Sequence, residues 1–386
     1  MPVHFDAAEM RARRQTVATS IANAGLDALL VFKQESMYYL TGYDTFGFSL
    51  FQCLIVDADG STNLFTRLPD LRQAQYTSDL TEQQIHIWRD REGVQPAQEL
   101  RSLLDHLGLA GKRFGIELDS YGLKAAAWRA LEVELTGFCV WEDASQLVDR
   151  VRARKSDQEI VYARRAAVLA DDAWDEAVRL SCPGAFEGDI LAAMQGAVFK
   201  GGGDYAGNEF IIGSGPAALL VRYHTGRRYL AHEDQLTLEF AGAYRRYHAA
   251  MMRTLLIGEV DAQHQQMFDA CVEALHACMH TLRPGVSMGE VFSAHADVMD
   301  ARSYATHRMA ACGYGMGAVY NPLWVDPPMF YAGNPLEVES RNVFFLHMIL
   351  ANSDTGHAMS LGQTVLVTEH GCESLSRSNL ELVCVA

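Results

Sequence analysis

The chain has 386 residues, 49% of them hydrophobic and 21% charged, a composition typical of a packed globular protein long enough for two domains. Its 32 Lys and Arg against 48 Asp and Glu give a formal net charge of −16, which repels nucleic-acid phosphates and anionic lipid. No basic patch offsets this charge. We therefore expect a small-molecule partner, and neither nucleic acid nor a membrane.

The cysteines and the N-terminus bear on the cellular compartment. The eight cysteines include no Cys-x-x-Cys pair, which argues against structural zinc. The N-terminal segment carries charges where a signal peptide has an apolar core, and no apolar run approaches the ~20 residues of a membrane span. These features predict a cytoplasmic protein with reduced thiols.

The first part of the chain alternates helical and strand-like segments. A charged amphipathic helix is predicted at residues 7–23 and another helix at 97–107, with buried strands at 26–32 and 113–119. Between them, Asp57-Ala58-Asp59-Gly60 supplies the turn chemistry of a hairpin. This alternation predicts an α/β domain over residues 1–150.

A second domain is predicted over residues 151–386. Ser156-Asp157-Gln158-Glu159 is a capping box that opens a long helical period, and a second capping box pairs Ser287 with Glu290. Further helices are predicted at 186–199 and 264–282, and strand-like segments lie at 235–258, 342–350 and 363–369. Two strand-rich segments, each tied to a pair of helices, indicate an internal duplication in an α+β domain.

Four segments in order along the chain carry a family resemblance. They are MYYLTGY at 37–43, RKSDQEI at 154–160, the strand at 235–240 leading to Met252-Arg253-Thr254, and TVLVTE at 364–369. Together they resemble the creatinase, prolidase and aminopeptidase P (M24) family over nearly the whole chain. The resemblance implies a pita-bread catalytic domain behind a smaller creatinase-type N-terminal α/β domain, and a homodimer.

Most members of that family bind two metal ions through two Asp, one His and two Glu. The corresponding positions here are Glu239, Ala250, Tyr314, His347 and Gly362. Two hard divalent cations need several bridging carboxylates, which one Glu and one His do not supply. We therefore predict no catalytic metal and no other cofactor.

The segment from Glu239 to Gly242, together with Arg253-Thr254 and His347, is most similar to ectoine hydrolase, a metal-independent branch of the family that opens a cyclic amidine. That similarity implies that Glu239 is catalytic. Departures from the branch lie at 45–48 and 321–328, segments that by analogy line the pocket. They leave the identity of the substrate open.

Three residues are predicted to be catalytic. A desolvated Glu239 carboxylate beside a planar amidinium is both counter-ion and nucleophile, and a buried ion pair is the alternative. His347 could protonate the departing nitrogen and deprotonate water, unless it is a core histidine. Tyr314, which lies between two glycines, either donates a hydrogen bond or only packs.

Arg222 and Asn321 are predicted to bind substrate, because they stand where the family has substrate-binding histidines. An arginine there would hold a substrate carboxylate by a bidentate pair. His248 is placed in the same group, although a solvated position would explain it equally well. The same alternative applies to His224 and His232.

The aromatic residues Tyr43, Phe46 and Phe48 follow Leu40-Thr41-Gly42. In the family, the residues after this element approach the active site across the dimer, so the N-terminal domain would reach the partner's site. The alternative is that these aromatics pack the small domain. His264, His276 and His280 lie on a predicted helix without a third metal ligand nearby, and they are interpreted as surface or packing residues.

These observations predict a metal-independent hydrolase of a non-peptide C–N bond in a small carboxylated cyclic amidine, with ectoine as the leading substrate. A creatinase-like amidinohydrolase and an Xaa-Pro-type peptidase are alternatives from other branches. A non-catalytic small-molecule-binding relative is the third possibility.

Overall fold

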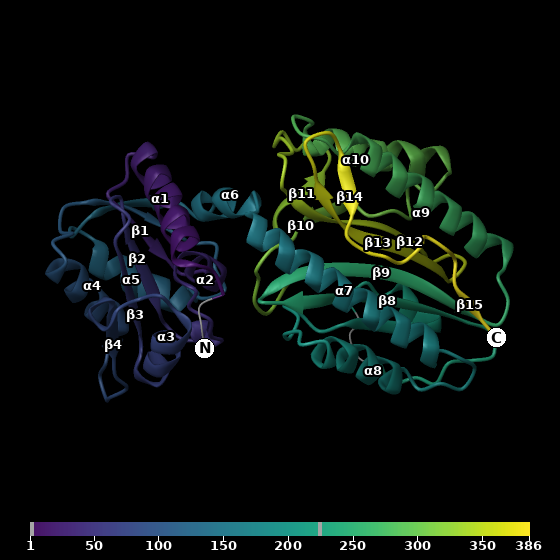
Figure 1. Cartoon of the computed structure of the whole chain (residues 1–386), viewed down its shortest axis with the longest axis horizontal. Coiled ribbons are helices and arrows are strands. Elements are labelled where there is room, and N and C mark those ends of the chain that lie inside the picture. Colours follow the sequence, from purple (N-terminus) through teal and green to yellow (C-terminus); the bar gives the residue numbers. More distant parts are fainter. Residues whose placement is uncertain (1–3, 223–225) are drawn as a thin grey trace. The chain divides into compact units, whose positions relative to one another are not determined.

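The structure is a computed structural model that describes residues 4–222 and 226–386. The chain divides into two compact units, Met1–Arg152 and Ala153–Ala386 (Figure 1). Among the described residues, no helix is both long enough and apolar enough to cross a membrane.

The first unit contains a six-stranded sheet with the strand order β4-β3-β2-β1-β5-β6. Its strands are β1 (Ala28–Val31), β2 (Cys53–Asp57), β3 (Thr62–Arg67), β4 (Ile85–Trp88), β5 (Arg113–Ile116) and β6 (Val140–Asp143). Its helices are α1 (Ala7–Asn23), α2 (Gln34–Thr41), α3 (Leu71–Thr77), α4 (Pro96–His106), α5 (Ala125–Leu135) and α6 (Leu147–Ala153). The predicted hairpin is confirmed, because β2 and β3 pair antiparallel on either side of the Asp57–Gly60 turn.

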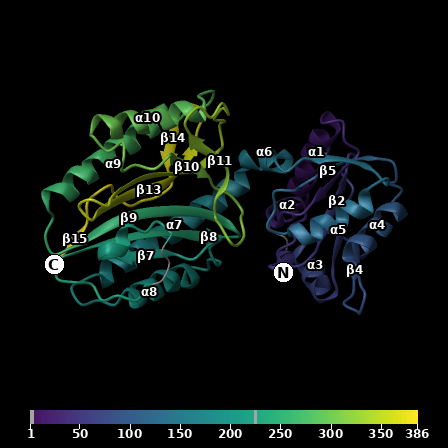
Figure 2. The ribbon, with the colours of Figure 1, turned by 180° about the vertical axis from the view of Figure 1, so that it is seen from behind.

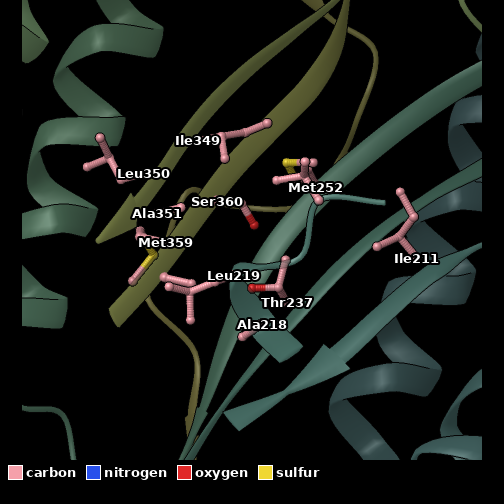
Figure 3. A pocket seen from close by; sticks show the side chains of 12 residues that line it. Ile211, Ala218, Leu219, Thr237, Met252, Ile349, Leu350, Ala351, Met359 and Ser360 are labelled. Carbon is pink, nitrogen blue, oxygen red and sulfur yellow. The ribbon is translucent and has the colours of Figure 1, made fainter. Parts of the chain in front are cut away.

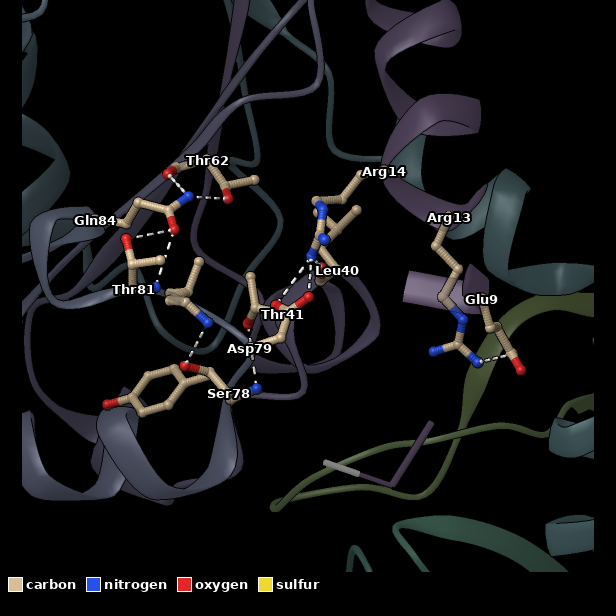
Figure 4. Close-up of polar contacts among 12 residues, drawn as sticks. Glu9, Arg13, Arg14, Leu40, Thr41, Thr62, Ser78, Asp79, Thr81 and Gln84 are labelled. Atoms are coloured by element: carbon tan, nitrogen blue, oxygen red, sulfur yellow. Dashed lines mark hydrogen bonds and ion pairs between the residues drawn. The ribbon is translucent and has the colours of Figure 1, made fainter. Parts of the chain in front are cut away.

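Polar contacts hold α1 against the end of α2 in this unit. The Arg14 guanidinium donates to the Leu40 carbonyl at 3.0 Å and to the Asp79 carboxylate at 2.7 Å (Figure 4). The Asp79 backbone N–H in turn donates to the Thr41 carbonyl at 2.9 Å. The Leu-Thr-Gly element is therefore anchored from two sides, and its path does not depend on α2 alone.

The second unit contains a nine-stranded sheet with the path β11-β10-β12-β13-β9-β8-β7, to which β14 adds beside β13 and β15 beside β9. Its strands are β7 (Ile211–Ser214), β8 (Asp234–Tyr244), β9 (Tyr247–Ile257), β10 (Ala311–Gly315), β11 (Asp326–Tyr331), β12 (Val343–Asn352), β13 (His357–Val367), β14 (Cys372–Ser374) and β15 (Cys384–Val385). Its helices are α7 (Asp157–Leu180), α8 (Glu187–Lys200), α9 (Ala262–Thr281) and α10 (Met288–Ala301).

Both capping boxes predicted from the sequence are confirmed, at the N-terminus of α7 and at that of α10. Each helix pair precedes its strands: α7 packs on β8 and β9, and α9 packs on β12 and β13. Figures 1 and 2 both show α9 and α10 along one side of these strands and α8 along the other. The sheet is covered on both faces, so β8 and β9 are buried along almost their whole length, including polar residues such as Glu239 and Arg253.

Candidate active site

Strand register brings the five family ligand positions to one face of the large sheet. Glu239 pairs with Met252, and Ala241 pairs with Ala250. Gly362 lies between Met252 and His347 in the ladder. Tyr314 pairs with Phe345. Because alternate residues of a strand share a face, all five positions point the same way.

Glu239 is 9% exposed and accepts a hydrogen bond from the Tyr314 hydroxyl at 3.4 Å. Burial raises the pKa of Glu239 to about 7, although the charge of Arg222 and the bond from Tyr314 lower it. The carboxylate is therefore poised between its two protonation states near neutral pH. This is the range in which a base or nucleophile is most useful.

Tyr314 both donates a hydrogen bond and packs. Its hydroxyl accepts from the Trp324 indole N–H at 2.9 Å, so its own proton is directed at Glu239. Burial raises the pKa of Tyr314 well above its usual value, and the phenol stays neutral. Its ring lies 5.6 Å from that of His347, centroid to centroid. Sequence reasoning did not single out Trp324, because only the fold shows that its N–H meets Tyr314.

His347 is buried, and its Nδ1 has no hydrogen-bond partner in the described part of the chain. Burial, with repulsion from His295 and Arg222, lowers the pKa of His347 to about 3, so the imidazole is neutral. His295, on α10, is likewise buried, and its Nδ1 is also without a partner among the residues described. Sequence reasoning missed His295, since nothing in the α10 sequence distinguishes it from a core residue.

An apolar pocket lies beside Glu239 (Figure 3). It is lined by Ile211, Ala218, Leu219, Val221, Thr237, Met252, Ile349, Leu350, Ala351, Ala358, Met359 and Ser360. Ile211 and Met252 are the residues that flank Glu239 in the ladder. The hydroxyls of Thr237 and Ser360 face the space, and the Thr254 hydroxyl lies 3.3 and 3.1 Å from them. Most of the pocket wall is therefore apolar, and the hydroxyls of Thr237 and Ser360 form its polar part.

Arg222 directly follows the lining residue Val221 and is exposed. Its positive charge lowers the pKa values of Glu239, Tyr314 and His347, which places it close to all three. It is therefore available to an anionic group at the mouth of the pocket. His224, also considered from the sequence, lies outside the described residues.

His248 does not have the predicted role. Its Nδ1 lies 2.8 Å from the Arg246 carbonyl and its Nε2 accepts from the Gly207 N–H at 2.9 Å. Burial lowers the pKa of His248 to about 4, so the ring is neutral. Both ring nitrogens are engaged, and neither is left for a substrate. This histidine instead attaches the loop at Gly207 to β9, which corrects both the predicted substrate contact and the solvated alternative.

The aromatic group after Leu40-Thr41-Gly42 divides in the structure. Tyr43 is fully buried in the core of the first unit, with its hydroxyl 3.4 Å from Gln52 and from Thr66, so its predicted place in a pocket is corrected to packing. Phe46 is 84% exposed, and Phe48 is half-buried. Asn321 is exposed after β10, and no contact within the described chain joins it to Glu239.

The residues present do not fit a dinuclear metal centre. Ala250 offers a methyl group where a carboxylate would be needed. At Gly362 an added Cβ would lie 2.7 Å from Cζ of Phe345 and 2.9 Å from the Leu346 carbonyl, so the phenyl ring fills the place of the fifth ligand. Glu239 and His347 remain as the only strong metal donors of the five positions.

Two family models match the chain. The model of metallopeptidase family M24 matches residues 162–369, and that of the creatinase/prolidase N-terminal domain matches residues 13–154. The chain belongs to metallopeptidase family M24. The resemblance stated from the sequence and the predicted pita-bread fold are thereby confirmed.

Several characterised or named proteins are similar over their whole length. Ectoine hydrolase of Halomonas elongata is 27% identical, with 96% of each chain covered. The probable dipeptidase PepE of Mycobacterium tuberculosis is 26% identical, covering 99% of this chain and 98% of that protein. The crystal structure of dipeptidase PepE from Mycobacterium ulcerans superposes with a TM-score of 0.85 at 23% identity over 99% of each chain, a likeness that concerns the fold. Sequence similarity alone therefore does not separate amidine hydrolysis from dipeptide hydrolysis.

Proposed function

We propose that this M24-family hydrolase cleaves a non-peptide C–N bond in a small carboxylated cyclic amidine, without a catalytic metal. The observation that supports this most is the donor set: one buried carboxylate, Glu239, where family members have a metal cluster. Phe345 also occupies the space above Gly362, where the fifth metal ligand of other family members would lie. The site therefore differs from theirs in shape as well as in its donor atoms.

The charges of the site match a zwitterionic substrate. An amidinium beside Glu239 would stabilise the ionised carboxylate, and Arg222, whose charge lowers the pKa of Glu239, would bind a substrate carboxylate. The apolar side chains of Ile211, Met252 and Ile349 would contact the saturated ring of the substrate. A dipeptide also carries a cation, its α-ammonium group, but its scissile amide is neutral, whereas in an amidinium the positive charge lies on the group that is cleaved.

In the proposed reaction, a Glu239 oxygen bonds to the amidinium carbon, and the C=N electron pair moves to nitrogen. The ring C–N bond then breaks with its electron pair on the departing nitrogen, which takes up a proton and leaves as an amine. Water next attacks the remaining adduct and releases the amide product and the free carboxylate. Neutral His347 can relay both protons: first from the retained amidine nitrogen, which loses one as its new C=N bond forms, to the departing nitrogen, and then from the attacking water to the released amine.

Turnover with and without chelator tests the proposal. Protein treated with EDTA should open a cyclic amidine such as ectoine as fast as untreated protein, and Glu239→Gln should be inactive. A creatine substrate and an Xaa-Pro dipeptide assayed in parallel test the amidinohydrolase and peptidase alternatives. Loss of turnover on chelation that manganese restores would overturn the metal-free mechanism, and failure to turn over any of the three would favour a binding protein.

The role of Glu239 as nucleophile has its own test. Rapid quenching and intact-mass measurement should show the protein heavier by the substrate fragment, mapped to the peptide that contains Glu239. Glu239→Asp should be nearly as inactive as Glu239→Gln, because attack tolerates little change from a contact of about 3–3.5 Å. An active Asp variant without an adduct would make Glu239 a counter-ion and leave His347 to activate water.

A further inference from the structure

A second polar cluster lies at the N-terminal end of β8, where α9 begins. Asp261 is the N-cap of α9, His264 lies in its first turn, and His357 opens β13. The Asp261 Oδ2 atom is 2.6 Å from His264 Nδ1 and 3.3 Å from His357 Nε2. Three donor atoms from two separate elements thus lie within 4.8 Å of one another.

The hydrogen-bond partner of His264 Nε2 shows which ring nitrogen of His264 carries the proton. His264 Nε2 lies 3.0 Å from the side-chain oxygen of Gln235. The Gln235 amide nitrogen donates to the carbonyls of Gly215 and Gly356, at 3.1 and 2.7 Å, so the amide cannot be turned round. Because the Gln235 oxygen only accepts, His264 Nε2 must be the donor.

A neutral His264 therefore presents a lone pair on Nδ1 to the lone pairs of the Asp261 carboxylate. Contact at 2.6 Å between two acceptors is repulsive unless a cation lies between or beside them. A proton on His264 Nδ1 would join only these two atoms, whereas a metal ion at the same place would be shared by all three donors, which lie within 4.8 Å of one another.

The surroundings resemble the outer shell of a metal site. Metal-bound histidines usually donate the other ring N–H to an oxygen, as His264 does to Gln235. His357 Nδ1 has the Thr355 hydroxyl at 2.9 Å, and that hydroxyl also accepts from Gln263 at 2.8 Å. The Asp261 side chain is 50% exposed, which leaves room for a water ligand.

We propose that Asp261, His264 and His357 bind a zinc ion that ties the β12–β13 turn to the start of α9. Two imidazole nitrogens with one carboxylate suit zinc, whereas calcium and magnesium prefer oxygen donors throughout. The site is separate from the catalytic one: Gln235 and Glu239 share β8, and at about 3.4 Å per residue their Cα atoms are on the order of 13 Å apart. The sequence predicted only surface or packing roles for His264.

Metal-free full-length protein titrated with zinc chloride in a calorimeter tests the proposal. We expect one zinc ion per chain and a higher unfolding temperature when zinc is added. His357→Ala and Asp261→Asn should each weaken binding by about 100-fold or more, and asparagine keeps the N-cap of α9. His276→Ala, which changes an exposed histidine of the same helix, is the matched control and should bind as the wild type does.

Cobalt in place of zinc gives a second readout that does not depend on folding stability. Wild-type protein should show the visible absorption of a low-coordinate cobalt site, which His357→Ala should lack. No uptake of either metal, or uptake that both ligand variants retain, would overturn the proposal and leave a proton-bridged histidine–aspartate pair. His357→Ala should turn over substrate normally, so this test is independent of the proposed amidine hydrolysis.

Discussion

At the scale of single residues, Glu239 is held in surroundings that disfavour its charge. Its usual pKa of 4.5 rises to about 7 on burial, and no lysine or arginine of the described chain forms an ion pair with it. His347 is shifted the opposite way for the same reason, since burial disfavours its charged form. The shift of Glu239 reduces the free energy of unfolding above pH 4.5, and that of His347 reduces it below pH 6.5. A cationic substrate would stabilise the ionised form of Glu239.

Glu239→Gln should therefore stabilise the free protein at pH 8. The folded state holds the Glu239 proton more tightly than the unfolded state, so stability falls as pH rises from 4.5 to about 7, and the whole penalty is present above pH 7. A shift of this size corresponds to on the order of 3 kcal/mol. Denaturant unfolding of both proteins should show this gain at pH 8 and little difference at pH 5, with His347 cancelling in the comparison.

Arg222→Ala should change both the pH profile and substrate binding. The Arg222 charge lowers the pKa of Glu239, so its removal should move the acid limb of kcat/KM to higher pH. KM for carboxylate substrates should rise by the equivalent of about 2–3 kcal/mol, with a smaller effect on kcat. Arg222→Lys separates the two effects, because it keeps the charge and loses the bidentate geometry. An unchanged KM would place the substrate carboxylate elsewhere.

At the scale of elements, the position of Glu239 depends on how closely α7 approaches β8. Gly242 lies in β8, and a Cβ added there would be 2.0 Å from the Ala166 carbonyl and 2.6 Å from the Ala170 backbone nitrogen. Both contacts are with helix backbone, which cannot move aside as a side chain can. The absence of a side chain at this residue therefore determines the spacing between the helix and the strand that carries Glu239.

Gly242→Ala should destabilise the protein by about 3 kcal/mol or more, or prevent folding, because the added methyl group forces α7 away from the sheet. Gly196→Ala is the matched control: Gly196 lies within α8, and an added Cβ would meet nothing within 4 Å. That change should stabilise the helix by about 0.5–1 kcal/mol. Thermal unfolding of the two variants decides the matter, and a Gly242→Ala protein as stable as the wild type would contradict the close packing.

At the scale of the whole molecule, we propose a homodimer in which the N-terminal domain of one protomer contributes to the site of its partner. Phe46 is the residue placed to show this, since its side chain is 84% exposed in the single chain. An aromatic ring this exposed contributes little to packing within the protomer. The exposed ring is therefore available for contact with a second copy of the chain.

Phe46→Ala should lower kcat/KM, and it should leave the unfolding temperature of the individual protomer nearly unchanged. Light scattering on the wild type should give twice the mass of one chain. Tyr76→Ala, which removes another exposed aromatic of the first unit, is the control and should affect neither activity nor assembly. A Phe46→Ala enzyme with full activity would remove this residue from the site.

The sequence by itself determined the features that arise from neighbouring residues. The capping boxes at Ser156 and Ser287, the hairpin turn after Asp57 and the helix at 7–23 each depend on side chains within a few positions of one another. Family motifs added the pita-bread fold, which is confirmed, and named Glu239 as a candidate catalytic residue, which stays a prediction. The local predictions succeed because local hydrogen bonding and hydrophobic periodicity act before any tertiary contact forms.

Only the tertiary structure decided which distant residues meet. Asp261 and His357 are 96 residues apart in the chain and face each other because β13 begins beside the start of α9. Tyr43 proved to be core, and Trp324 proved to direct the Tyr314 hydroxyl at Glu239. Strand register and helix packing determine such pairings, and both depend on burial of the whole core, which a local pattern does not encode.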